Sequence, residues 1–124
     1  MLIAKTFETH KKIQKIIYPG LESHPNHATA LKQMDGFGAM ISLEVKGGLD
    51  AARTFLSSLK IFSLAESLGG VESLAEHPGL MTHASVPKEH REAAGIKDGL
   101  IRLSVGIEDG KDLINDISSA LDAI

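Results

Sequence analysis

The chain has 124 residues, of which 43% are hydrophobic, 23% charged and 4% aromatic, and its net charge at pH 7 is −3; it is therefore expected to form one domain, residues 1–124, around a single core. An acidic chain with few aromatic residues lacks the surfaces that bind nucleic acid, and no apolar run approaches the roughly 20 residues that span a membrane. The absence of cysteine excludes disulfides and thiolate metal sites and fits a cytoplasmic protein.

The N-terminal part of the chain is predicted to contain a helix, a strand and a second helix. Apolar residues at helical spacing place the first helix at residues 2–12, and the strand follows at 15–18. The turn dipeptide Pro19-Gly20 ends this strand. The second helix is expected over residues 24–34.

The middle of the chain shows clear strand and helix patterns. Residues 40–45 alternate between apolar and polar side chains, which indicates a strand with one buried face. Residues 49–60 carry an apolar stripe at helical spacing and predict a strong helix. The run 61–65 is predicted to be the next strand, and a short helical pattern resumes after the two glycines that follow it.

The C-terminal part is predicted to hold two more helices and one more strand. A short polar helix over residues 87–94 precedes Gly95, which is a suitable C-cap. Residues 100–105 alternate in polarity and predict a strand. Asp109 is a good N-cap for the last helix, whose apolar residues recur at helical spacing.

These elements together predict an α/β fold of the α+β type. Because the strands alternate in polarity, we expect a small antiparallel or mixed sheet of three or four strands, with helices on one face. The other face would carry Ser42, Glu44, Arg102 and Ser104. A polar face of this kind is either solvated or forms the wall of a binding site.

Arg102 is the first candidate for a functional residue, because it lies between two apolar neighbours within a predicted strand. A guanidinium group in that position needs a partner or water, since it stays charged. Its planar fork of donors matches a carboxylate with two parallel hydrogen bonds. A surface arginine or a structural ion pair is the alternative interpretation.

The turn that begins with Glu66-Ser67 and continues into Gly69-Gly70 is the second candidate. Backbone N–H groups in a glycine-rich turn are able to hold an anion. The alternative is that the polar pair only caps the end of a strand. The glycine spacing does not match a dinucleotide-binding motif.

The six histidines do not predict a metal site. His24 and His27 lie three residues apart, but zinc requires three or four convergent ligands, and no others are apparent. His77 is expected at the surface, and His83 is expected either to line a pocket or to be buried and hydrogen-bonded. The spacing Ser57-Ser58-Leu59-Lys60 matches an acyl-transfer motif by chance, since its companion motifs are missing.

Four segments of the chain resemble one enzyme family. They are YPGLESHP at 18–25, LAESLGGVESL at 64–74, MTHAS at 81–85 and GLIRLSVGIED at 99–109. In this order and spacing they are similar to the Cys/Met-metabolism family of pyridoxal-phosphate (PLP) enzymes, and most of all to its cystathionine gamma-synthase and gamma-lyase branch. The resemblance covers nearly the whole chain.

The resemblance implies that this chain is the C-terminal small domain of a longer fold-type I enzyme, whose large PLP-binding domain is absent here. It also implies a substrate-binding role for five residues. Arg102 would bind the α-carboxylate of an amino-acid substrate and Ser67 would help to hold it; Glu66 would lie near the distal end of the substrate, and Leu68 and Thr82 would lie close by. A homo-oligomer is expected.

The resemblance further implies that the chain has no catalytic or cofactor-binding residue of its own. PLP enzymes bind their cofactor through a lysine, and none of the ten lysines stands in the family's lysine motif. The isolated chain is therefore predicted to be inactive. Two alternatives remain open: a free-standing, non-catalytic binding module with the same fold, and an assembly partner that docks on a separate PLP domain.

Overall fold

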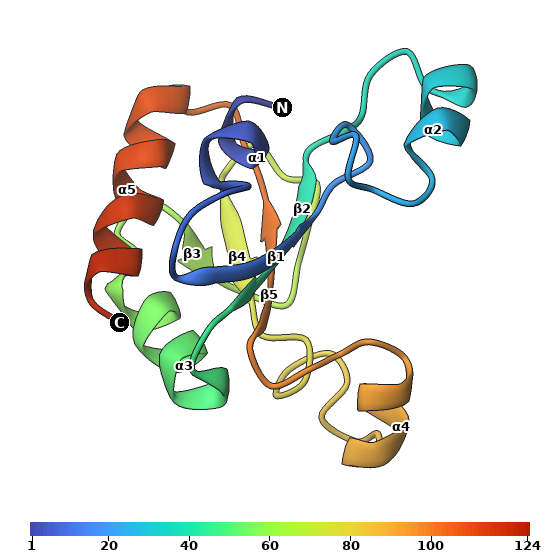
Figure 1. The fold of residues 1–124 in the computed structure, drawn as a ribbon. Coiled ribbons are helices and arrows are strands. Elements are labelled where there is room, and N and C mark those ends of the chain that lie inside the picture. Colours follow the sequence, from blue (N-terminus) through green and yellow to red (C-terminus); the bar gives the residue numbers. More distant parts are fainter.

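The computed structural model describes residues 1–124 and contains one mixed five-stranded sheet and five helices (Figure 1). The strand order is β1-β2-β5-β4-β3; neighbours are antiparallel except β3 and β4, which are parallel. The elements in chain order are α1 (Leu2–Phe7), β1 (Ile13–Ile17), α2 (His27–Gln33), β2 (Met40–Val45), α3 (Gly48–Ser58), β3 (Ser63–Leu64), β4 (Leu74–Glu76), α4 (Lys88–Ala93), β5 (Leu100–Ser104) and α5 (Gly110–Asp122).

Helices α1, α3 and α5 cover one face of the sheet and enclose the core, as predicted (Figure 1). The strand period of two turns Ile41, Leu43 and Val45 of β2 toward these helices. Phe55 of α3 and Leu103 of β5 are completely buried in the same cluster. The helices therefore leave the opposite face of the sheet to its polar side chains.

The link between α3 and β3 is fastened to α5 by one buried carboxylate. Asp116 is 6% exposed and accepts hydrogen bonds from the backbone N–H groups of Lys60, Ile61 and Phe62 at 2.8, 2.9 and 3.1 Å. Helix α5 itself begins as predicted, because the Asp109 side chain accepts from the backbone of its first turn.

The predicted boundaries were wrong at the start of the chain, where the helix ends at Phe7 and the strand begins at Ile13. The physical reason is an irregular register between Ile13 and Lys15 in the pairing of β1 with β2. A bulge adds one residue to a strand, so the buried residues Ile13 and Ile16 are three apart and imitate helical spacing.

The helical pattern expected after Gly70 was also wrong, since β4 forms there and raises the number of strands to five. All three residues of β4 are buried, so no alternation marks the strand. Tertiary pairing with β5 determines its conformation rather than local propensity.

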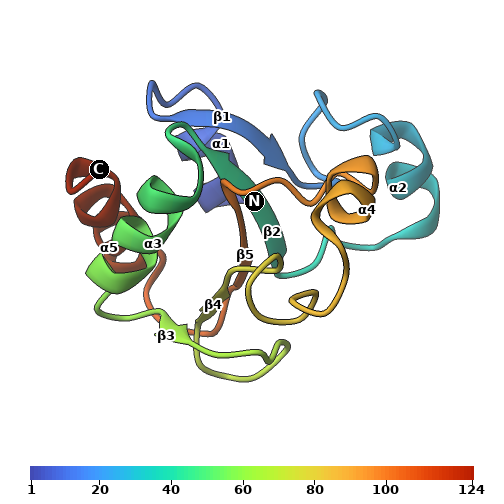
Figure 2. The same ribbon diagram turned by 90° about the horizontal axis from the view of Figure 1, so that it is seen from below.

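Helices α2 and α4 stand away from the helical layer, on the other side of the sheet (Figure 2). Helix α2 buries only Ala30, and α4 buries no residue. No helix in the structure has the length and apolar character needed to cross a membrane.

Candidate functional site

The polar face of the sheet brings together three side chains from three adjacent strands. Arg102 of β5 is the register partner of Glu76 on β4 and of Ser42 on β2. Because directly paired residues of neighbouring strands lie on the same face, all three project away from the core helices. Arg102 is thus at the centre of the face on which the sequence placed it.

Arg102 and Glu76 form an ion pair on this face. The Arg102 Nη2 to Glu76 Oε1 distance is 2.8 Å, and the two side chains are 26% and 1% exposed. Arg102 Nε and Glu76 Oε2 are buried without a hydrogen-bond partner. The structural ion pair considered from the sequence is therefore present, yet the guanidinium group keeps donors that a further carboxylate could use.

The glycine turn is attached to the same strand as Arg102. Gly69 has a φ of +74°, a conformation that glycine adopts at little cost, and its N–H donates to the Ser104 Oγ at 2.8 Å. Ser104 is two residues from Arg102 and therefore lies on the same face. This N–H is already occupied, so it does not serve the anion site that the sequence suggested for the turn.

Glu66, Ser67 and Leu68 precede Gly69 and are exposed. None of their side chains makes a hydrogen bond or ion pair with Arg102 in this structure. The structure thus brings the turn to the strand that carries Arg102, but it does not join the two through their side chains. Their binding roles stay predictions.

A second carboxylate fixes the start of β4. Glu108 accepts from the backbone N–H of Ser73 at 2.7 Å and from its hydroxyl at 2.8 Å, and the Ser73 Oγ accepts from the N–H of Gly106. The Ser73 N–H, which favours the ionised form, holds the pKa of Glu108 below its usual value. Since Ser73 leads directly into β4, these contacts help to position Glu76.

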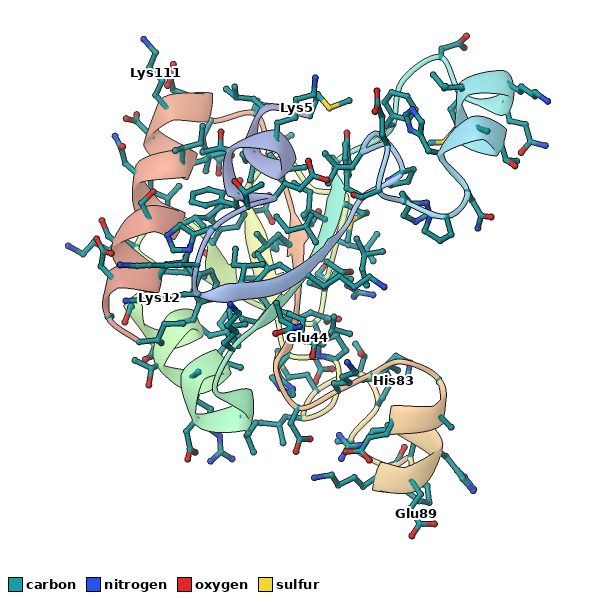
Figure 3. The ribbon with its side chains drawn as sticks, viewed as in Figure 1. Lys5, Lys12, Glu44, His83, Glu89 and Lys111 are labelled. Atoms are coloured by element: carbon teal, nitrogen blue, oxygen red, sulfur yellow. The ribbon has the colours of Figure 1, made fainter.

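The segment after β4 contributes Thr82, which is exposed. Its hydroxyl is 3.5 Å from Glu76 Oε1 and 2.8 Å from His83 Nδ1. Figure 3 shows His83 on the same side of the molecule as Glu44, away from α5. Thr82 therefore lies at the ion pair, whereas the half-buried ring of His83 forms its one hydrogen bond with the Thr82 hydroxyl.

The prediction that His77 lies at the surface was wrong, because this side chain is 2% exposed. Its Nε2 is 2.8 Å from the Asp98 carbonyl oxygen, and its Nδ1 accepts from the N–H of Leu80 at 3.1 Å. Both ring nitrogens are satisfied inside the protein, and this is what allows a polar ring to be buried.

The structure shows no group of three or more histidine and acidic side chains placed to hold a metal ion. The two histidines at the start of α2 make local contacts instead. His24 Nδ1 accepts from the N–H of Asn26, and His27 Nδ1 lies 2.7 Å from the carbonyl oxygen of Pro19.

The residues of this chain do not fit a complete PLP site. A lysine that binds PLP lies in a protected pocket, where its amino group becomes nucleophilic, but nine of the ten lysines here are exposed. The tenth, Lys12, donates to the carbonyl oxygen of Leu121 at 2.8 Å. Figure 3 shows Lys5, Lys12 and Lys111 along the side of α1 and α5. These helices cover the core face of the sheet, whereas Arg102 projects from the other face.

Glu76 is the residue of the site that sequence reasoning missed. Glu76 ends a strand of three buried residues, which is too short to show an alternation of polar and apolar side chains. The strand that carries it was therefore not predicted. Pro78 was a signal against a helix here, because a proline pushes the residue before it, His77, toward extended backbone and helices usually end by that residue.

Comparison with known proteins adds the family. The sequence profile described as "Cys/Met metabolism PLP-dependent enzyme" matches residues 1–122. The chain belongs to this family of PLP-dependent enzymes. It is 58% identical over 120 residues to a cystathionine gamma-lyase from Dictyostelium discoideum and, also over 120 residues, 58% identical to a cystathionine beta-lyase from Lactococcus lactis; both matches cover 97% of this chain and 31% of the relative.

A solved structure of the same family agrees. Cystathionine gamma synthase from Xanthomonas oryzae pv. oryzae in complex with cystathionine superposes with a TM-score of 0.93 and 51% identity, covering 98% of this chain and 31% of that one. The chain thus spans about a third of the length of these PLP-dependent relatives. Because gamma-lyase and beta-lyase relatives match it equally well, overall identity does not separate the activities within the family.

Proposed function

We propose that this chain is the C-terminal, substrate-carboxylate-binding domain of a PLP-dependent cystathionine gamma-lyase or gamma-synthase. The observation that carries the proposal is Arg102, a permanently charged fork at the centre of the polar sheet face, whose Nε has no partner in the protein. A permanent cation with free donors is suited to hold an α-carboxylate.

The other predicted residues take their roles around this arginine. Ser67 would share the substrate carboxylate, and Leu68 would line the same pocket. Glu66 would lie toward the distal end of the substrate and influence which side chain is accepted. Thr82 would approach from the loop after β4, where its hydroxyl already lies 3.5 Å from Glu76.

The proposed partner is the large PLP-binding domain of the same enzyme, which would supply the lysine and the rest of the pocket. Its support is a set of large exposed apolar side chains in the part of the chain that carries the site, since gathered apolar side chains mark a surface that another domain covers. One of them, Leu64, belongs to β3, and four lie between β3 and the start of α5: Leu68, Val71, Leu80 and Ile107. A homo-oligomer and a cytoplasmic location belong to the same proposal.

The test compares the full-length protein with the isolated 124 residues. At 13.2 kDa for 31% of a relative's length, the full protein should have a mass of about 43 kDa. Loaded with PLP, it is expected either to break down cystathionine or to form it from cysteine and an activated homoserine, whose γ-substituent leaves as the cysteine sulfur bonds to that carbon. The isolated chain should give neither reaction and no stoichiometric PLP absorbance, because it has no protected lysine.

Two results would contradict the proposal. PLP bound in equal amount to the isolated chain would show that the chain holds its own cofactor site. A natural protein of 13.2 kDa would support the free-standing module instead.

A further inference from the structure

We infer that Glu76 is a positioning residue, which holds the Arg102 guanidinium group in the orientation that receives a substrate carboxylate. The inference rests on the proposed function of Arg102. It concerns a buried acid to which the family resemblance assigned no role.

The geometry of the pair leaves polar atoms of both side chains without a hydrogen-bond partner. Glu76 Oε1 lies 2.8 Å from Arg102 Nη2, while Arg102 Nε has no hydrogen-bond partner. A pair built for stability alone would use both carboxylate oxygens in two parallel hydrogen bonds. The observed pair instead ties one end of the guanidinium group and leaves its remaining donors for a second carboxylate.

Burial makes this orientation fixed. Glu76 is 1% exposed and belongs to the short strand β4, whose backbone is paired with β5. Its start is held by the contacts of Ser73 with Glu108. An acid so enclosed has few alternative positions, so the arginine that it holds loses little further freedom when a ligand binds.

Charge balance points the same way. A buried carboxylate is costly unless it is paired, and Glu76 Oε2 is buried without a partner. Its pairing with Arg102 offsets part of this cost, and the same negative charge sets the direction of the guanidinium group.

The experiment uses the PLP-loaded full-length protein and the isosteric variant Glu76→Gln. We expect the KM for cystathionine to rise about tenfold, with kcat and PLP absorbance unchanged, because only the orientation of the carboxylate clamp is weakened. Glu76→Asp keeps the charge but shortens the reach, so it should also raise the KM. Glu44→Gln is the matched control: this acid lies on the same sheet face, pairs with Lys97 at 3.2 Å and should leave the KM unchanged.

A double-mutant cycle separates positioning from structure. In an Arg102→Ala background, Glu76→Gln should add almost nothing to the KM, since the group that it orients is gone. Equal effects of Glu76→Gln in the two backgrounds, or an unchanged KM in the single variant, would overturn the inference. If Arg102→Ala itself left the KM unchanged, the proposed function of Arg102 would be wrong, and this inference, which rests on it, would be wrong as well.

Discussion

Replacing Arg102 by alanine in the full-length protein is expected to raise the KM for cystathionine about a hundredfold, with PLP still bound. The loss of a charged partner in a hydrogen-bonded pair costs roughly 2–5 kcal/mol, and each 1.4 kcal/mol corresponds to a factor of about ten. The effect should be seen mainly in KM, because the arginine binds a group that does not react. Steady-state kinetics together with the PLP absorbance spectrum make the measurement.

Two further variants sharpen this prediction. Arg102→Lys keeps the positive charge but not the planar fork, so its KM should lie between those of the wild type and Arg102→Ala. Arg53→Ala removes an exposed arginine from the opposite, helical side and should change nothing. An Arg102→Ala protein with wild-type KM would remove this residue from the substrate site.

Replacing Asp116 by alanine is expected to lower the free energy of unfolding by about 3 kcal/mol. The change removes three hydrogen bonds from backbone N–H groups to one charged, buried acceptor, and each bond to a charged group contributes about 1.5–3 kcal/mol. Lys60 and Ile61 are exposed and their N–H groups gain water in return, so the loss is less than the sum. Denaturant unfolding measures it.

A second substitution at Asp116 tests whether the loss of stability follows the number of acceptor oxygens removed. Asp116→Asn keeps one oxygen, so it should lose about half as much stability as Asp116→Ala. Asp122→Ala, an exposed acid at the end of the same helix, is the matched control and should be close to neutral. If Asp116→Ala were as stable as this control, the carboxylate would not be what holds the α3–β3 link in place.

The parts of the fold that the sequence predicted are those with a regular period. Strand β2 has the predicted bounds because its side chains alternate without interruption, and α5 begins after Asp109 because a capping side chain marks the position. Strand β1 was displaced by a bulge, and β4 was missed because a strand buried on both faces has no alternation. Such features depend on partners that are distant in sequence.

The residues of the candidate site also differ in whether a local sequence pattern reveals them. Arg102 was recognisable because a charge between apolar neighbours in a strand is unusual, and the turn at Glu66 was recognisable by its glycines. Glu76 depends on a pairing between β4 and β5 that local patterns do not contain. The chemistry of single residues led only to an anion-binding wall; the substrate class came from the family resemblance.

The register of β4 against β5 gives the ion pair a second role, in folding specificity. A strand of three residues has too few contacts to select its own alignment, and a slip of one residue turns every side chain to the other face. Such a slip would move Glu76 into the layer beneath α3 and α5 and leave Arg102 without its acid. A misaligned pairing would therefore bury an unpaired carboxylate, so the charges of the candidate site favour the observed alignment of the last antiparallel pair of the sheet.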